Sequence, residues 1–165
     1  MTLANTSTRF YNNEVSPERL QELNKPCFSE EQINTFDAEA AELIRRNQAE
    51  QQENPAIAIR LFASEGSQSK RGGVITQGTS SLTITLPSGE ALAIARIGDP
   101  VEYPDGSIAY IETGAGDAFS NLALVGSRLD NGDEIINSRQ NIGHINLRKH
   151  SPPASDFLPA KKAEQ

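Results

Sequence analysis

The chain has 165 residues, of which 36% are hydrophobic, and its formal net charge at pH 7 is −7. This length suits one domain plus an extension, and an apolar content below the usual ~45–50% predicts a thin core, with part of the chain extended or packed on a partner. The negative charge disfavours attraction to nucleic acid or anionic lipid, so we expect no nucleic-acid partner. The single Cys27 cannot form an intramolecular disulfide, and we expect a small, half-buried residue there.

No targeting or membrane segment is visible in this sequence. No run of residues approaches the ~18–20 apolar positions of a membrane span. Residues 1–12 are polar and lack the apolar stretch of a secretory signal. We therefore expect assembly in the cytoplasm and exit, if any, inside a larger assembly or by a signal-independent route.

The N-terminal third predicts helices after an irregular start over residues 1–15. Ser16 before Pro17 is typical of a helix start and indicates a short helix. Ser29 and Gln32 have the spacing of a capping box, so we expect a second helix from Ser29 to about residue 50. Its apolar stripe is Ile33, Phe36, Ala40, Leu43 and Ile44. We interpret residues 1–55 as a helical extension whose stripe docks on the domain or a neighbour; a coiled-coil or adaptor arm is the alternative, for which the stripe alone is too short.

From Ala56 onward the pattern changes to short apolar runs separated by turn residues. Turn signals recur roughly every 8–12 residues, which indicates an all-β region. The pair Asn131-Gly132 is a strong hairpin signal, whereas residues 64–71 read as a polar loop. We therefore assign residues 56–150 to a β domain and residues 151–165 to an extended or disordered tail, unless a partner binds it.

Parts of the β region echo one another. Residues 71–75 (RGGVI) are followed by residues 93–100 (AIARIGDP), and a worn second copy appears at residues 122–127 (LALVGS), followed by Asn131-Gly132-Asp133. Short strands closed by Gly-Asp turns shape a backbone and carry no catalytic signature. The echo predicts a compact β structure built by repetition.

Candidate reactive residues have structural explanations beside chemical ones. Asp side chains at turns bond nearby backbone amides, whereas an enzyme would need two that face each other with separated pKa values. The turn positions are Asp99, Asp105, Asp117, Asp130 and Asp133. The histidines, His144 and His150, have no Cys nearby and do not form the pattern of a four-ligand zinc site; a metal role for His144 needs ligands from distant turns. No active site is readable, and a small β-fold enzyme or ligand-binding domain using acidic turns is the alternative hypothesis.

Residues 57–138 resemble a PAAR-repeat domain, the spike tip of contractile injection machines. Gly72-Gly73 stand where the family has a Gly-Gly pair at the start of a strand. Residues 93–99 resemble the name-giving Pro-Ala-Ala-Arg-Val-Gly-Asp, with Ala93 and Ile94 replacing Pro and Ala. The second copy has Leu124 for Arg and Ser127 for Asp. The family-motif positions that we interpret as structural are Gly72, Gly73, Arg96, Gly98 and Asp99.

The resemblance also implies a metal, such as zinc or iron, which family members commonly hold near the apex with His and Cys. The corresponding places here are Arg71, Tyr103-Pro104-Asp105 and Asn137-Ser138, so the usual ligand set is absent. We expect an apex without a metal, held by Arg71, Asp105 and backbone hydrogen bonds. An altered ligand set that includes His144 is the alternative.

The resemblance implies a mainly β fold: a cone-shaped β-repeat domain with a pseudo-threefold arrangement, preceded by the helical extension. It implies a non-enzymatic tip, one copy per trimer of a β-helical spike, that sharpens the spike for piercing an envelope and touches the target membrane transiently. The machine would be a phage tail, a type VI secretion system or an extracellular injection particle, with the protein at its tip. The N-terminal helices would pack on the cone or the spike, or recruit cargo.

Overall fold

The structure is a computed structural model that describes residues 9–158. The expectations for residues 1–8 and 159–165 lie outside the described residues. By its internal contacts the chain divides into two compact units. The described parts of the first unit are residues 9–13, 60–145 and 153–158, and the second unit comprises residues 14–59 and 146–152.

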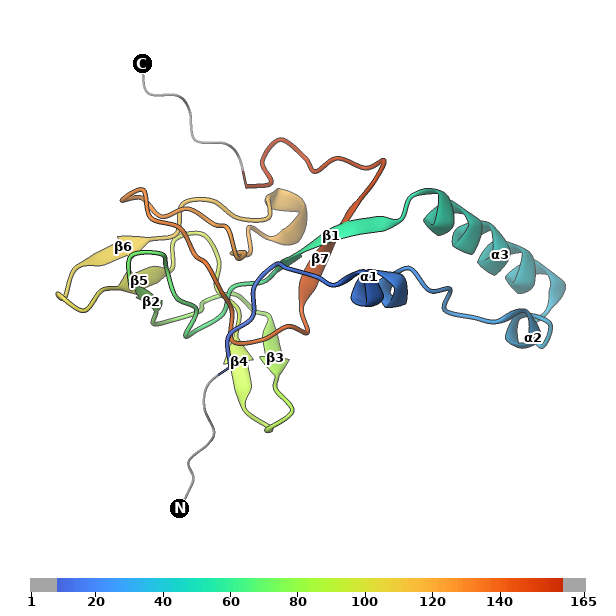
Figure 1. Cartoon of the computed structure of the whole chain (residues 1–165), viewed down its shortest axis with the longest axis horizontal. Coiled ribbons are helices and arrows are strands. Elements are labelled where there is room, and N and C mark those ends of the chain that lie inside the picture. Colours follow the sequence, from blue (N-terminus) through green and yellow to red (C-terminus); the bar gives the residue numbers. More distant parts are fainter. Residues whose placement is uncertain (1–8, 159–165) are drawn as a thin grey trace. The chain divides into compact units, whose positions relative to one another are not determined.

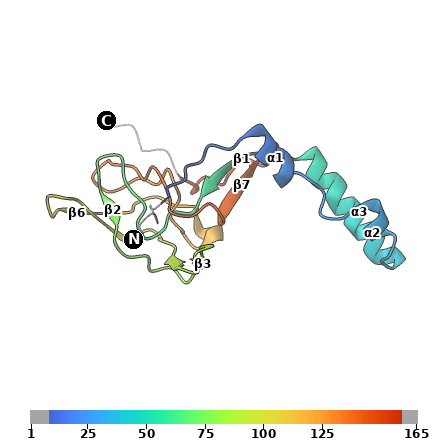
Figure 2. The same ribbon diagram turned by 60° about the horizontal axis from the view of Figure 1, so that its bottom comes forward.

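The second unit contains the helices α1 (Pro17–Leu23), α2 (Glu30–Ile33) and α3 (Ala38–Glu53). The predicted caps are confirmed, because the Arg19 backbone N–H donates to Ser16 Oγ at 3.1 Å and the Ser29 capping box is complete. A continuous helix from residue 29 to 50 is wrong. The chain turns after α2, and Asp37 starts a new helix by accepting the Ala40 backbone N–H at 2.8 Å. As a result α2 folds beside α3 (Figures 1 and 2).

The predicted stripe along these helices is buried only in part. Ile33 is fully buried, whereas Phe36 and Leu43 are 38% and 53% exposed. Phe36 packs edge-on against Phe28 with ring centroids 5.4 Å apart. Cys27 is exposed, not half-buried, because it lies in the turn region between α1 and α2.

The strands are short and antiparallel. β1 (Ala56–Leu61) pairs with β7 (His144–Arg148), and β3 (Thr83–Thr85) forms a hairpin with β4 (Ala91–Ala93). A three-stranded sheet has the order β2-β5-β6, from Val74–Ile75, Pro100–Glu102 and Ile108–Tyr110, and a 3-10 helix covers Asp117–Phe119 (Figure 1). The expectation of a mainly β chain is corrected: the fold is mixed, because helices fill much of the second unit and the strands of the first are interrupted by turns.

Three alanines close a ring of backbone hydrogen bonds in the first unit. Ala95 N–H donates to Ala63 O at 2.9 Å, Ala123 N–H to Ala95 O at 2.8 Å, and Ala63 N–H to Ala123 O at 2.9 Å. All three side chains are 0% exposed and belong to one hydrophobic core. We call this the alanine ring. Methyl side chains leave room for three backbones to meet around a packed core.

A turn and a hairpin follow each ring alanine. The first hairpin is residues 67–75, the second 99–111 and the third 127–135. At their tips Ser69 N–H donates to Gly73 O, Tyr103 N–H to Ser107 O and Leu129 N–H to Asp133 O, at 2.8–2.9 Å. At their bases Ile75, Ile111 and Ile135 N–H donate to Ser67, Asp99 and Ser127 O, at 2.9–3.1 Å. The same pattern thus occurs three times in one chain.

The hairpins also pair with one another in a cycle. The outgoing strand of the first pairs with the incoming strand of the second, Val74 opposite Glu102. The second pairs with the third in the same way, and the third returns to the first, at Ile111 opposite Leu129 and Ser69 opposite Ile135. The core inside comprises Ala63, Ile75, Ala95, Val101, Ala109, Ile111, Ala123, Leu129 and Ile135.

Candidate functional site

The candidate site is a polar cluster beneath the tips of the three hairpins: Ser69, Tyr103, Asn131 and Asp133. The Tyr103 hydroxyl donates to Asp133 Oδ2 at 2.5 Å and accepts from Asn131 Nδ2 at 3.0 Å. The Ser69 side chain lies beside them and lowers the pKa of both Asp133 and Tyr103. Side chains from all three hairpins therefore meet at one place.

Backbone groups complete the hydrogen bonding of the cluster. Asp133 Oδ1 accepts the Glu134 N–H at 2.8 Å and the Arg71 N–H at 3.2 Å, while Ser69 Oγ accepts the Gly73 N–H at 2.8 Å. Asp133 is 2% exposed and Ser69 is 3% exposed. A buried carboxylate is tolerable when donors surround it, and here donors reach both of its oxygens.

The cluster shifts the pKa values of two of its members in opposite directions. Burial raises the pKa of Asp133, but the hydrogen bonds from Ser69, Tyr103 and the backbone together outweigh it, so the pKa is lowered. Burial is the main cause that raises the pKa of Tyr103, and its bond to Asp133 adds to this. Asp133 is thus held as a carboxylate and Tyr103 as a neutral phenol.

The two glycines of the Gly-Gly pair have different structural roles. Gly72 has φ of +95°, and a Cβ there would meet nothing within 4 Å, so its role is the turn. A Cβ on Gly73 would lie 2.6 Å from Val101 Cγ1, 2.9 Å from Ser69 Oγ and 3.0 Å from Tyr103 Cε1. Gly73 therefore lets the first hairpin pack closely against the second, beside the cluster.

In the Gly-Asp turn, the Asp99 side chain holds the neighbouring backbone in place by hydrogen bonds. Asp99 is 3% exposed and accepts the Arg96 backbone N–H at 2.9 Å and the Thr79 N–H and hydroxyl at 2.9 and 2.5 Å. The Arg96 guanidinium in turn donates to Thr79 Oγ1 at 2.9 Å. Gly98 supplies the positive φ of +96° that the turn requires.

Serine takes the place of Asp99 in the other two copies. Leu124 N–H donates to Ser127 Oγ and Ser64 N–H donates to Ser67 Oγ, both at 2.9 Å. The prediction of a polar loop over residues 64–71 is wrong at Ser64–Ser67, which form another copy of this turn. The shared spacing Ala-x-x-Gly-Ser/Asp at residues 63–67, 95–99 and 123–127 is the signal that identifies it.

The cluster does not have the chemistry of the metal centre that the family resemblance implies. The Tyr103 hydroxyl already donates to the one carboxylate and accepts from the Asn131 amide. The Arg71 guanidinium lies over the third hairpin, donating to Asn131 O at 3.2 Å. Within residues 9–158 no group of three or more His, Cys, Asp or Glu side chains is arranged to hold a metal ion. His144 lies in β7, and Asp105 bonds Ser107 within its own hairpin at 2.6 and 2.9 Å, so of the expected holders only Arg71 touches the cluster.

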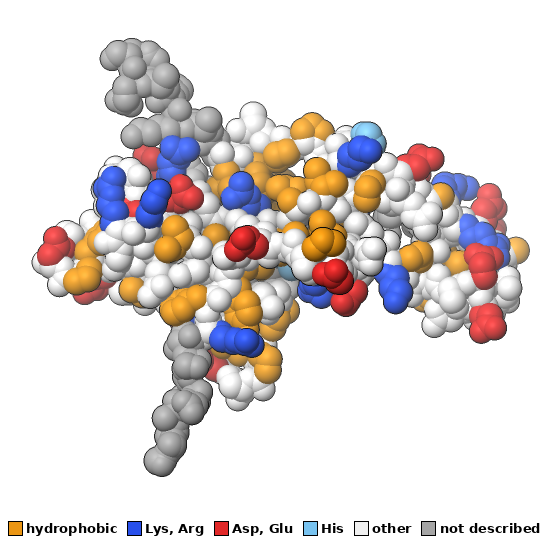
Figure 3. Space-filling view, in the orientation of Figure 1, with side chains coloured by type: hydrophobic (Ala, Val, Ile, Leu, Met, Phe, Trp, Pro, Cys, Tyr) orange, Lys and Arg blue, Asp and Glu red, His pale blue; other side chains and the backbone are white. Residues whose placement is uncertain are grey.

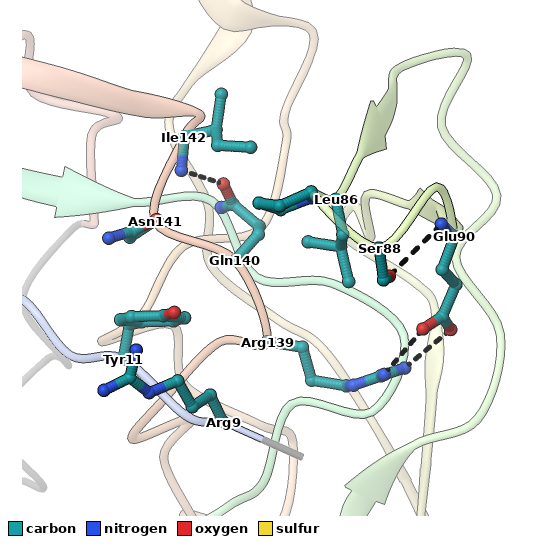
Figure 4. A pocket seen from close by; sticks show the side chains of 10 residues that line it. Arg9, Tyr11, Leu86, Ser88, Glu90, Arg139, Gln140, Asn141 and Ile142 are labelled. Carbon is teal, nitrogen blue, oxygen red and sulfur yellow. Dashed lines mark hydrogen bonds and ion pairs between the residues drawn. The ribbon is translucent and has the colours of Figure 1, made fainter. Parts of the chain in front are cut away.

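The other acidic turn residues accept hydrogen bonds from neighbouring groups. Asp130 accepts the Tyr110 N–H at 3.1 Å, and Asp117 accepts from Asn121 Nδ2 at 3.4 Å. A hollow of about 300 Å³ also lies in the first unit (Figure 4). Its one acid, Glu90, is held by Arg139 through two bonds of 3.0 and 3.1 Å. Neither place offers the facing acid pair that the enzyme alternative needs.

Comparison of the chain with protein-family models, with curated proteins and with solved structures found no match.

Among the described helices none combines the length and apolar character needed to cross a bilayer. Acidic and basic side chains are interspersed over the face shown in Figure 3.

Proposed function

We propose that the chain is a non-enzymatic spike-tip protein of a contractile injection machine, with the first unit as a cone-shaped, PAAR-like domain of pseudo-threefold symmetry. The observation that carries this proposal is the hydrogen-bond pattern that occurs three times within one chain and closes at the alanine ring. A single chain with three equivalent units can present three equivalent contacts to a threefold-symmetric trimer. One copy would cap each trimer.

The hairpin-tip end and the alanine-ring end of the first unit differ, and this difference supports one orientation of the unit on the spike. The hairpin tips are drawn together by the polar cluster and would form the point, leaving the turns beside the alanine ring to face the spike. Docking on a β-helical trimer would cover these turns. In use, the tip would contact the target membrane transiently at the end of a phage tail, a secretion system or an extracellular particle.

The second unit has a separate proposed role in this scheme. Its helical region has apolar side chains that are partly exposed: Phe28 and Phe36 on either side of α2, at 37% and 38%, and Leu43 in α3, at 53%. Exposed apolar groups that lie close together favour association with another protein. We assign them to docking on the spike or to holding cargo.

The test is co-expression with the β-helical spike trimer of the same contractile system, followed by affinity capture through the trimer. Two exposed isoleucines give matched variants: Ile97, 38% exposed beside the ring, and Ile108, 51% exposed near a hairpin tip. We expect Ile97→Asp to weaken capture at least tenfold and Ile108→Asp to leave it unchanged. Capture that fails for the unmodified chain, or turnover of a substrate at the acidic turns, would reject the proposal.

A further inference from the structure

We propose that the Ser69–Tyr103–Asp133 cluster is the device that locks the three hairpins together, occupying the place where the resembled family uses a metal ion. Each hairpin supplies one of these side chains: a serine from the first, a tyrosine from the second and an aspartate from the third. This inference concerns the interior of the tip and holds whether or not the chain binds a spike.

The length of the second hairpin explains why the side chain that it contributes to the cluster is a tyrosine. Residues 100–110 separate the paired positions Asp99 and Ile111, whereas residues 68–74 and 128–134 fill the same interval in the other hairpins. The second hairpin is therefore longer, and its tip residue Tyr103 starts further from the ring. A long side chain with a terminal hydroxyl spans the space to Asp133, to which it donates at 2.5 Å.

Asp133 is the hub of the lock because it accepts from every hairpin. It receives the Tyr103 hydroxyl from the second, the Arg71 N–H from the first and the Glu134 N–H from its own. The Ser69 side chain of the first hairpin also lowers its pKa. Hydrogen bonds to a buried carboxylate are stronger than those between neutral groups. A metal ion would have to displace these donors and would find one carboxylate beside two hydroxyls and an amide, a poor set for zinc.

The experiment measures the thermal midpoint of the purified full chain with and without EDTA and added Zn²⁺, together with its metal content. We expect neither reagent to change the midpoint. Tyr103→Phe and Ser69→Ala should each lower it by roughly 3–10 °C. The first removes a donor to the buried Asp133 carboxylate, and the second removes the acceptor of the Gly73 N–H. The matched control is Tyr110→Phe, since Tyr110 lies on the same hairpin, is 48% exposed and should lose nothing.

A double-mutant cycle then tests whether the two partners act as one unit. If Tyr103→Phe and Asp133→Asn remove one shared bond, the midpoint of the double variant falls by less than the sum of the single losses. Should Asp133→Asn fail to fold, the pair Tyr103→Phe and Ser69→Ala serves the same cycle through their shared partner. Stoichiometric metal whose removal by EDTA lowers the midpoint, or a Tyr103→Phe midpoint equal to that of Tyr110→Phe, would overturn the inference.

Discussion

The Tyr103 hydroxyl lies 2.5 Å from Oδ2 of Asp133, and the phenol and the carboxylate belong to different hairpins. This bond joins residues 30 positions apart in the chain. Its two partners titrate at opposite ends of the pH scale, so the stability of the folded chain should depend on pH through both of them.

The first prediction concerns acid. The pKa of Asp133 is lowered in the folded chain, so its contribution to stability is present above the unfolded pKa of about 3.9 and is lost as pH falls through the folded value. We expect the free energy of unfolding to fall below about pH 4 and this part of the fall to vanish in Asp133→Asn. The charged residues beside it on the first and third hairpins are Lys70, Arg71, Asp130 and Glu134, all of them exposed. Denaturant titrations from neutral to acid pH measure the effect, with Asp105→Asn as the control that retains the Asp133 step.

The second prediction concerns alkali. The pKa of Tyr103 is raised by burial and by Asp133, so its contribution is intact below the unfolded pKa of about 10 and is lost as pH rises through the folded value. Tyr103→Phe should lose this alkaline dependence, and Tyr110→Phe should keep it. Phenolate absorbance during an alkaline titration shows the same group directly. If the Tyr103 phenol titrates at the ordinary tyrosine pKa of about 10, the predicted burial effect is absent.

The third prediction compares the two glycines at the first tip. Gly73→Ala should destabilise the fold by about 1–3 kcal/mol, because the new Cβ overpacks the contact with Val101. Gly72→Ala introduces no contact within 4 Å, so it should bear only the backbone strain of its positive φ, about 1–2 kcal/mol. Urea unfolding measures both, and substitution of Gly73 should also perturb the phenolic titration of Tyr103, which substitution of Gly72 leaves alone.

The fourth prediction compares equivalent glycines in two repeats. Gly66 and Gly98 both have positive φ, of +86° and +96°. A Cβ on Gly66 would overlap Arg139 Cδ, whereas one on Gly98 would meet nothing within 4 Å. Since Glu90 pins the Arg139 guanidinium, Gly66→Ala should cost more stability than Gly98→Ala by at least about 1 kcal/mol. Equal losses would mean that Arg139 moves aside freely.

The fifth prediction concerns the serines that replace Asp99. Ser67→Ala and Ser127→Ala should each lower the free energy of unfolding by about 1–3 kcal/mol, because the buried N–H groups of Ser64 and Leu124 lose their acceptors. The effects should be similar, as the repeats are equivalent. Ser81→Ala, at an exposed position, is the control. A loss at one serine alone would show that the copies are not equivalent in energy.

Local signals in the sequence were enough to predict the helix caps, the Asn131 hairpin and two copies of the turn. Predictions from these local signals failed where contacts between distant parts of the chain determine the structure. The first copy was hidden because Ser67 replaces Asp99, although both side chains accept the same type of backbone N–H. The break before Asp37 was missed because a second helix cap lay inside an apolar stripe.

The polar cluster was beyond prediction for a related reason. Asp133 was correctly placed at a turn, yet its main partner Tyr103 lies on another hairpin and is brought to it by the cyclic pairing of strands. The spacing of residues along the chain does not predict the contact between Tyr103 and Asp133. The expected apex holder Asp105 has the same residue type but points into its own turn, toward Ser107.

The proposed capping of a spike trimer is tested most directly by the native mass of a complex between the full chain and a β-helical spike trimer. One copy of this 17.9 kDa chain bound per spike trimer, with no added mass from a second or third copy, is the predicted result. Three copies per trimer, or no complex at any concentration at which both components stay folded, would contradict it.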